Sequence, residues 1–265
     1  MKLWNKEDNL DKKIDEFTVG NDRKYDMYLA KYDVIASIAH AKMLCKINIL
    51  TDEESTKIIN TLNNIFKNIE SENFNIGNGF EDIHSKIESL LIDELGNIGK
   101  KIHTGRSRND QVLVATQLFL KNEINEIKKL TIKLFNTLID LAETNKNELL
   151  PGYTHLQVAM PSSFGLWFSS YAENLIDDIL YLKTAYEINN QNPLGSGAGY
   201  GSSFKIDRNF TTKELDFGDL KYNVVSAQMS RGKVEKSVII AINSIASTLS
   251  TIRLDCLDSP DYIFG

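Results

Sequence analysis

Four cationic residues stand just before a long stretch of helical periodicity, in the segment Lys100-Lys-Ile-His-Thr-Gly-Arg-Ser-Arg-Asn-Asp-Gln111. A helix that starts within residues 107–110 leaves free backbone N–H groups and the positive end of its dipole at that point. Guanidinium groups from Arg106 and Arg108 beside such a start suit a carboxylate or a phosphate. The alternative is a solvated basic turn, but the density of Thr, Ser, Asn and Arg favours ligand binding.

A histidine follows the end of this stretch, in Leu150-Pro-Gly-Tyr-Thr-His-Leu-Gln157. Pro151 and Gly152 end the helix, which places His155 in a turn between two long helices. An imidazole there can act as an acid or a base near pH 7, with the Thr154 hydroxyl beside it. A second interpretation stays open, in which His155 satisfies carbonyl groups at the helix end.

Glycines recur at every second position in Asn192-Pro-Leu-Gly-Ser-Gly-Ala-Gly-Tyr-Gly-Ser-Ser-Phe204. The dinucleotide-binding pattern fails because its last glycine is replaced by Tyr200 and no parallel strand precedes it. The P-loop pattern fails because neither Gly-Lys pair has the required earlier glycine. We expect either a connector between helices or a flexible loop whose backbone approaches a ligand closely.

The histidines do not predict a metal site. His40, His84, His103 and His155 lack metal-ligand spacing and the two cysteines are far apart, although Glu81-Asp-Ile-His84 places carboxylates near one imidazole. We therefore expect no metal and no cofactor. His40 lies within a predicted helix and is interpreted as a packing or surface residue.

Long helices must position these segments. Apolar residues recur at steps of three and four within 120–141, 164–186 and 234–256. A helix of some 35 residues is about 50 Å long, which favours a long bundle over an α/β sheet. The last stretch is also largely uncharged on its other faces, so we expect neighbouring chains to cover it.

Shorter helices are predicted in the N-terminal third, at Asp26–Ile47, Glu53–Glu70 and Ile83–Leu95. Thr51-Asp-Glu-Glu54 has the spacing of a capping box, with Asp52 as an alternative cap. The predicted fold is all-α. An N-terminal helical domain covers residues 1–105, and a long central helical bundle covers residues 106–265.

Composition narrows the class of protein further. The 265 residues carry a net charge of −6, with 42% apolar and 25% charged residues, as in an ordinary soluble protein. The acidic excess argues against a nucleic-acid partner. No stretch resembles a signal peptide or an 18-residue membrane span, and two cysteines indicate a reducing compartment. We expect a cytoplasmic protein without a membrane partner.

Two segments resemble the first two signatures of the argininosuccinate lyase family, which belongs to the fumarase/aspartase superfamily. They are Thr104-Gly-Arg-Ser-Arg-Asn-Asp-Gln111 and Gly152-Tyr-Thr-His-Leu-Gln157. The Gly-Arg-Ser-Arg-Asn-Asp string separates this family from fumarases and adenylosuccinate lyases. The resemblance runs in order from Leu3 to about Leu257, effectively the whole chain, and is supported by Leu3-Trp4, 32–41, Glu81–His84 and Pro193–Gly197.

The resemblance implies a fumarase/aspartase-type bundle and reversible β-elimination of argininosuccinate to L-arginine and fumarate, in arginine biosynthesis. It also implies a homotetramer with active sites shared between subunits. His155 would be the acid/base histidine, with Thr154 as its catalytic neighbour. The substrate-binding residues implied by position are Asn109, Arg108, Ser107, Thr154 and His84.

Two departures from the family pattern stand out. Phe17–Asp26 lacks the substrate-binding serine often found near the N-terminus, and we transfer no role to Gly20, Asn21 or Asp22. The third signature, a loop with a catalytic serine, should follow the last long helix, but the sequence ends at Gly265. We therefore expect a fold that is incomplete at the C-terminus and a 265-residue chain without activity. The alternatives are a non-catalytic, crystallin-like helical assembly and another fumarate-releasing lyase of the superfamily.

Overall fold

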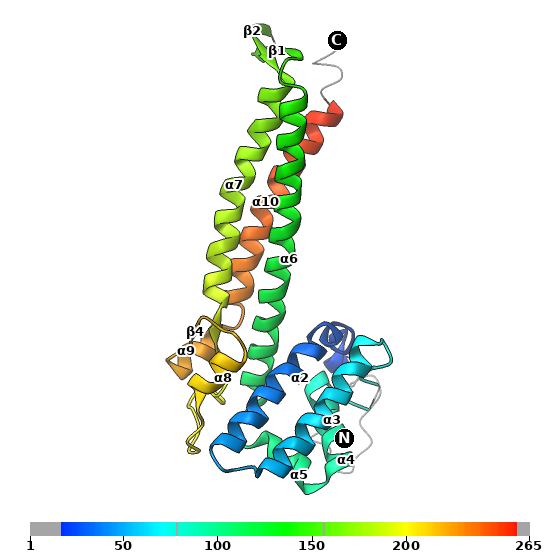
Figure 1. The fold of residues 1–265 in the computed structure, drawn as a ribbon, viewed down its shortest axis with the longest axis vertical. Coiled ribbons are helices and arrows are strands. Elements are labelled where there is room, and N and C mark those ends of the chain that lie inside the picture. Colours follow the sequence, from blue (N-terminus) through cyan, green and yellow to red (C-terminus); the bar gives the residue numbers. More distant parts are fainter. Residues whose placement is uncertain (1–16, 78, 156, 259–265) are drawn as a thin grey trace. The chain divides into compact units, whose positions relative to one another are not determined.

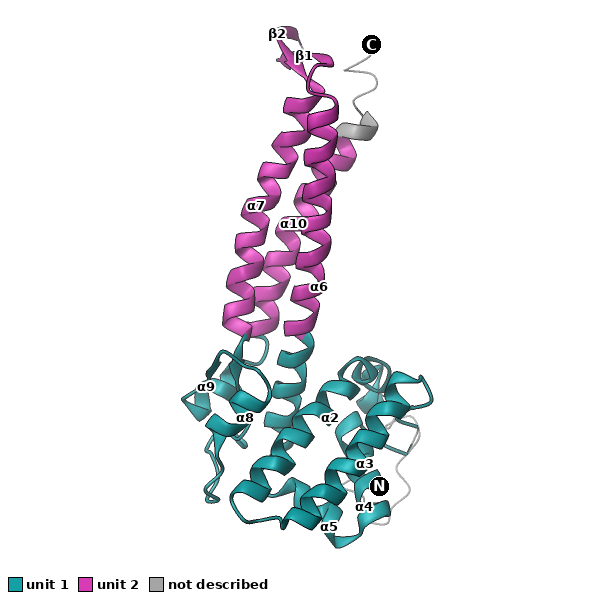
Figure 2. Cartoon of the chain, viewed as in Figure 1, with its two compact units in different colours: residues 1–119, 190–232 teal, residues 120–189, 233–265 magenta. Residues whose placement is uncertain are grey.

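Helices dominate the computed structural model, which describes residues 17–77, 79–155 and 157–258. The prediction of an all-α fold is confirmed, and the chain forms two compact units (Figure 2). The first unit comprises Met1–Phe119 with Asn190–Gly232, and the second comprises Leu120–Asn189 with Lys233–Gly265. The units collect segments that are distant in the chain, and the division at residues 105 and 106 stays a prediction.

Short helices build the first unit. Its elements are α2 (Asp22–Lys46), α3 (Asp52–Glu70), α4 (Ile83–Leu95), α5 (Asn97–Lys100), η1 (Lys101–His103), the beginning of α6 (Arg108–Thr144), β3 (Gln191–Asn192), α8 (Arg208–Glu214), β4 (Asp219–Leu220) and α9 (Val224–Met229). The three predicted N-terminal helices are all present, with starts and ends within four residues of those expected.

The capping box at the start of α3 is formed by Thr51. Its Oγ1 accepts a hydrogen bond from Glu54 N (3.2 Å), while the Glu54 carboxylate accepts one from Thr51 N (3.1 Å). Two donors that the helix leaves unpaired are satisfied reciprocally. Asp52 is therefore the first helical residue and not the cap.

The core of the first unit has two parts. Apolar side chains of α2, α3 and α4 form one cluster, in which Leu44, Ile58 and Leu91 are fully buried. A second cluster joins Ala36 of α2 to Val114 of α6 and to Leu194 of the glycine-rich segment. Burial of this apolar area fixes the start of α6 against α2, and that start carries the first predicted functional motif.

Three long helices build the second unit and run side by side in Figure 1. They are the rest of α6, α7 (Phe164–Asn189) and α10 (Lys233–Asp258). Leu138 and Leu175 are buried in one core cluster, and Leu182 and Ile245 in another. A buried polar contact adds to this packing, because Asp178 on α7 accepts a hydrogen bond from Ser244 Oγ on α10 (2.5 Å).

Helix lengths differ from the prediction of three helices of about 35 residues. Helix α6 has 37 residues, but α7 and α10 have 26 each. Helix α7 ends where the chain enters β3, and α10 starts only after Gly232, whose φ is +81°. A positive φ is compatible with glycine and is not helical, so it marks a true boundary.

Four short strands were not predicted. β1 (Leu149–Thr154) and β2 (Gln157–Ser163) form an antiparallel hairpin between α6 and α7, with an irregularity between Gly152 and Tyr153. A side chain at Gly152 would meet Met160 O at 2.9 Å, so the hairpin needs glycine there. The pair β3–β4 is parallel and has two residues in each strand.

Candidate functional site

The start of α6 is held by its own side chains. Ser107 Oγ accepts a hydrogen bond from Asn109 N (3.3 Å), which is the arrangement of a helix N-cap. The Ser107 N–H in turn donates to Asp110 Oδ1 (2.8 Å). Asn109 is exposed and Asp110 is buried. Four consecutive residues thus place one accessible amide side chain at the positive end of a long helix.

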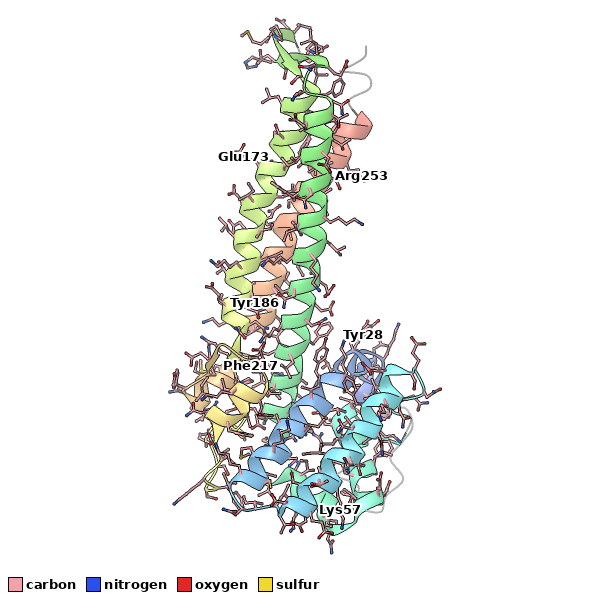
Figure 3. All side chains as sticks on the ribbon, in the orientation of Figure 1. Tyr28, Lys57, Glu173, Tyr186, Phe217 and Arg253 are labelled. Atoms are coloured by element: carbon pink, nitrogen blue, oxygen red, sulfur yellow. The ribbon has the colours of Figure 1, made fainter. Side chains whose placement is uncertain are left out.

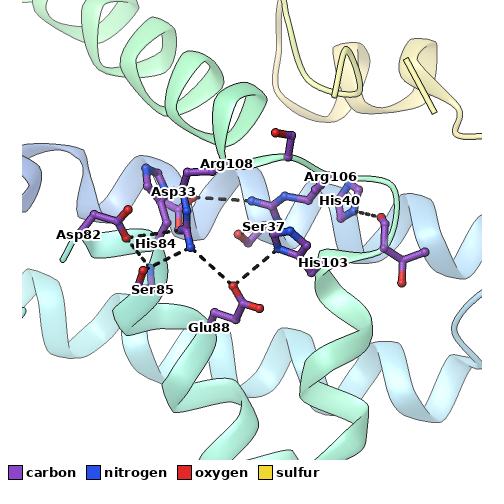
Figure 4. Close-up of polar contacts among 12 residues, drawn as sticks. Asp33, Ser37, His40, Asp82, His84, Ser85, Glu88, His103, Arg106 and Arg108 are labelled. Carbon is purple, nitrogen blue, oxygen red and sulfur yellow. Dashed lines mark hydrogen bonds and ion pairs between the residues drawn. The ribbon is translucent and has the colours of Figure 1, made fainter. Parts of the chain in front are cut away.

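Arg108 is the first residue of α6 and reaches three side chains of the α4 region (Figure 4). Its guanidinium lies 3.5 Å from Asp82 Oδ1 and 3.8 Å from Glu88 Oε2, and it donates a hydrogen bond to Ser85 Oγ (3.3 Å). Asp82 itself caps α4 by accepting from Ser85 N (2.7 Å). These contacts fix the orientation of Arg108 and neutralise part of its charge.

His84 lies in a buried cluster of charges. Its Nδ1 is 2.8 Å from Asp33 Oδ1, and the side chains are only 2% and 1% exposed. Arg106 NH2 lies 3.7 Å from the same carboxylate oxygen, and Arg106 NH1 donates to Ser37 Oγ (3.1 Å). In the described part of the chain, the His84 ring therefore faces Asp33, and its contact with substrate stays a prediction.

Asp33 and Ser37 were not predicted as site residues, and His40 is a buried packing residue, one of the two interpretations that the sequence left open. All three are buried on α2, and His40 Nε2 donates to the Thr104 carbonyl oxygen (3.0 Å). Their spacing of four and then three residues places them on one face of the helix. A polar stripe on a helix that is otherwise rich in buried apolar residues is the signal that could have revealed this cluster.

Electrostatics distinguish the members of this cluster. Burial alone would raise the pKa of Asp33, but the charges of His84, Arg106 and Arg108 and the hydrogen bond from His84 lower it below its ordinary value. Burial and the nearby Arg106 charge lower the pKa of His40 well below its ordinary value. Asp33 is therefore an anion and His40 a neutral imidazole near pH 7.

Burial has a similar effect at His103. Its pKa is lowered by burial and by Arg106 and Arg108, against the opposing charge of Glu88, whose carboxylate lies 3.6 Å from His103 Nδ1. A small cavity opens among these side chains, lined by Asp33, His84, Glu88, His103, Arg106 and Gln111. The cluster thus pairs the positive charges of Arg106 and Arg108 with the carboxylates of Asp33 and Glu88, beside the imidazoles of His84 and His103.

The glycine-rich segment approaches a protein carboxylate. Asp110 Oδ2 accepts hydrogen bonds from Gly195 N (2.9 Å) and Gly197 N (3.1 Å). Burial raises the pKa of Asp110, although these hydrogen bonds and Arg106 oppose the shift. Residues 192–197 are buried, whereas Tyr200 is exposed. Glycine permits a close approach of the backbone, and at residues 192–197 this approach is to the buried Asp110 carboxylate of the protein itself.

Thr154 and His155 lie at the tip of the β1–β2 hairpin in the second unit. Both side chains are exposed, and His155 has a φ of +53°. The turn position expected for His155 is confirmed, within a hairpin that sequence analysis did not predict. In the second unit this hairpin stands at the end of the bundle far from Leu120, where the chain enters the unit (Figure 2).

The predicted site residues thus fall into two groups. His84, Ser107, Arg108 and Asn109 belong to the first unit, and Thr154 and His155 belong to the second. Across the described ranges, no group of three or more His, Cys, Asp and Glu side chains is arranged to hold a metal ion. The first group can bind and polarise an anion, and the second can move a proton.

Comparison with known proteins extends these observations. A family model described as lyase matches residues 5–256. The argininosuccinate lyase of Phocaeicola vulgatus is 51% identical over 264 residues, which cover 100% of this chain and 59% of that protein. The argininosuccinate lyase of Parabacteroides distasonis is 53% identical with the same coverage. That of Thermotoga neapolitana is 42% identical over 256 residues, which cover 97% of this chain and 64% of that protein. The chain spans about three fifths of the length of these relatives.

Solved structures with the same fold include two lyases. EDDS lyase in complex with formate has a TM-score of 0.75 and 23% identity, over 92% of this chain and 49% of that chain. A fumarate lyase:delta crystallin from Brucella melitensis, bound to cobalt, has a TM-score of 0.74 and 19% identity, over 88% and 55%. The likeness confirms that the helical bundle is of the type expected.

Proposed function

The chain belongs to the lyase family, whose model covers residues 5–256, and from this we propose that it is part of an argininosuccinate lyase. The reaction is the reversible β-elimination of argininosuccinate to L-arginine and fumarate. The observation that carries the proposal is an identity of 51–53% to curated argininosuccinate lyases over 264 residues. Formation of arginine places the reaction in arginine biosynthesis, and small soluble reactants suit the cytoplasm.

The elimination makes two demands on the protein. A base removes a proton from the carbon next to a carboxylate, the C–N bond to the guanidino group breaks, and the departing nitrogen receives a proton. Negative charge grows on that carboxylate as the proton leaves, so fixed donors and cations lower the barrier most. The residues at the start of α6 suit the stabilisation of this negative charge, and His155 on the hairpin suits one of the two proton transfers.

We assign carboxylate binding to the start of α6. Arg108 is fixed by Asp82 and Glu88, and Ser107 and Asn109 lie at the positive end of the helix. Asn109 is the exposed member and offers both an amide donor and an acceptor to the substrate. His84 supports this region through its contact with Asp33.

We assign one of the two proton transfers to His155, with Thr154 orienting the substrate beside it. The imidazole is exposed on a hairpin and is therefore free to meet a group outside its own unit. Within the second unit, α6 runs for 25 residues from Leu120 to Thr144, or about 37 Å, before the chain reaches the hairpin. We propose that neighbouring copies bring the two groups of residues together.

Assembly of several copies is supported by the surface of the second unit. Side chains project outward along all three helices (Figure 3), and many large aliphatic ones are exposed, among them Leu130, Leu141, Leu166, Ile176, Leu180, Ile239, Ile240 and Leu249. By length and composition, Lys233–Leu254 is even apolar enough to cross a membrane. We propose that these faces are covered by other copies in a homotetramer with shared active sites.

The proposed activity is tested with the protein at its full length, because the relatives are longer than this chain. The purified protein is mixed with argininosuccinate, and fumarate release is followed by its ultraviolet absorbance. We expect turnover with argininosuccinate and none with adenylosuccinate. Absence of fumarate release from argininosuccinate by a folded oligomer would reject the proposal. The 265-residue chain, assayed in parallel, is expected to be inactive because the resemblance assigns a catalytic serine to a further segment.

A further inference from the structure

One buried carboxylate connects the substrate-binding start of α6 to a distant part of the first unit. Asp110 is 0% exposed and accepts three backbone hydrogen bonds, from Ser107, Gly195 and Gly197. A buried carboxylate is costly unless its oxygens are hydrogen-bonded, so all three donors are needed to keep it there. Asp110 therefore connects the start of α6 to Gly195 and Gly197, which lie 85 and 87 residues further along the sequence.

The glycine segment is built to receive this carboxylate. Gly195 and Gly197 have φ values of +84° and +59°, so their N–H groups converge on one point. A side chain at Gly195 would meet Arg208 Cγ at 2.8 Å, and one at Gly197 would meet Gly201 O at 2.8 Å. Glycine is required at both positions, and the anion that fills the resulting concavity is Asp110.

The outer side of the glycine segment is also fixed. Gln228 on α9 donates from Nε2 to Ser196 Oγ (2.9 Å) and to Gly197 O (2.9 Å). Asn192 Oδ1 accepts a hydrogen bond from Leu194 N (2.9 Å). The segment is thus held on its outer side by Gln228 and Asn192, and its backbone N–H groups bind Asp110 at the start of α6.

We propose that Asp110 is a positioning residue, which holds Ser107 and Asn109 at the place where substrate binds by anchoring them to the glycine segment. This rests on the proposed function. Asp110 does not itself meet the substrate, because its carboxylate is buried and its hydrogen bonds are directed to backbone. It acts through Ser107, whose N–H it binds, and through Asn109, its direct neighbour in the chain.

The test replaces the carboxylate with an amide in the full-length protein. In Asp110→Asn, one oxygen is exchanged for a donor that faces other N–H donors, so at least one backbone bond is lost. Because a displacement of about 1 Å can cost about 100-fold in rate, we expect kcat/KM to fall about 100-fold with a raised KM. Amide hydrogen exchange at Gly195 and Gly197 should become faster.

Asp207→Asn is the matched control. Asp207 also accepts a backbone hydrogen bond at a helix start, from Phe210 N (2.9 Å) at α8, and its other carboxylate oxygen pairs with the exposed Lys46 (2.8 Å) on α2. Asparagine caps helices as well as aspartate, so kcat/KM and exchange at the two glycines should be unchanged.

Four outcomes decide the proposal. A raised KM with faster exchange at both glycines supports it. A lowered kcat with an unchanged KM would indicate loss of folded protein only, and it would overturn the positioning role. If the wild-type protein releases no fumarate, the proposed function fails. If the amides of Gly195 and Gly197 exchange as slowly in Asp110→Asn as in the wild-type protein, the role of Asp110 is overturned, whatever the result of the fumarate assay.

Discussion

The two units of this chain handle polar and apolar surface in opposite ways. The first buries charged and polar side chains, such as Asp33, Arg106 and Asp110, and pairs them with one another or with backbone. The second leaves large aliphatic side chains, such as Leu180 and Ile239, 57% and 65% exposed. The first unit thus holds buried charges close to one another, whereas the second has exposed apolar faces suited to other chains.

The difference also matches the two functional tasks that we propose for these units. Side chains that bind a charged group need a fixed orientation, and the first unit supplies it through many buried contacts. A residue that serves a site on another copy must be exposed, and the hairpin that carries His155 is exposed. The buried contacts of the first unit and the exposed hairpin of the second therefore suit the different tasks that we propose for them.

Replacement of His155 tests whether the hairpin contributes to activity and not to stability. In the full-length protein, His155→Asn removes an acid/base group, and kcat should fall by about 10²- to 10⁴-fold. The melting temperature should stay the same because the side chain is exposed. Fumarate release and thermal unfolding measure the two effects. Near-normal turnover would defeat the assignment of His155.

Replacement of Arg106 tests the buried charges of the first unit. Arg106→Met removes the guanidinium that lies 3.7 Å from the buried Asp33 carboxylate, and breaking a buried ion pair costs about 3–5 kcal/mol of the free energy of unfolding. Urea unfolding measures the loss. The control is Lys57→Met. The Lys57–Glu53 pair is exposed, so its loss should leave the urea midpoint of unfolding unchanged. Equal urea midpoints for Arg106→Met and Lys57→Met would contradict a stabilising role for the buried charges of the first unit.

A charge on the exposed face of α10 tests the role of the second unit in assembly. Ile239→Glu places a carboxylate in a surface that we expect other copies to cover, at a cost of about 3 kcal/mol or about 100-fold weaker association. Sedimentation velocity should show a smaller assembly with unchanged helical content. The control is Tyr28→Glu, on a 62% exposed residue of the first unit. An unchanged mass for Ile239→Glu would reject the covered face.

The smallest expected effect is a pH dependence of the first unit. The pKa of His40 is well below its ordinary value of 6.5 in the folded protein. The unfolded chain therefore takes up the proton first, and stability present above pH 6.5 is lost as the pH falls below it. The urea concentration at the midpoint of unfolding should decrease as the pH is lowered from 7 to 5.5. This decrease should be smaller in His40→Gln, although a part remains because His103 shifts in the same direction.

Local signals predicted the helices well, and tertiary contacts account for what was missed. The capping box at Thr51 and the apolar stripe of Ile83–Leu95 determine their helices within a few residues. The hairpin at 149–163 was missed because its apolar residues do not alternate, and pairing across the turn determines it. Asp33 is similar, because Arg106, its partner, is distant in the sequence.

The backbone of His155 limits which residues can replace it. A φ of +53° is tolerated by glycine, asparagine, aspartate and histidine, but it is unfavourable for β-branched residues. Among these, only histidine has an unperturbed pKa near neutrality. Random change at this position is therefore expected to produce mainly two classes of variants. One class keeps the turn and loses the proton transfer, and the other distorts the turn itself.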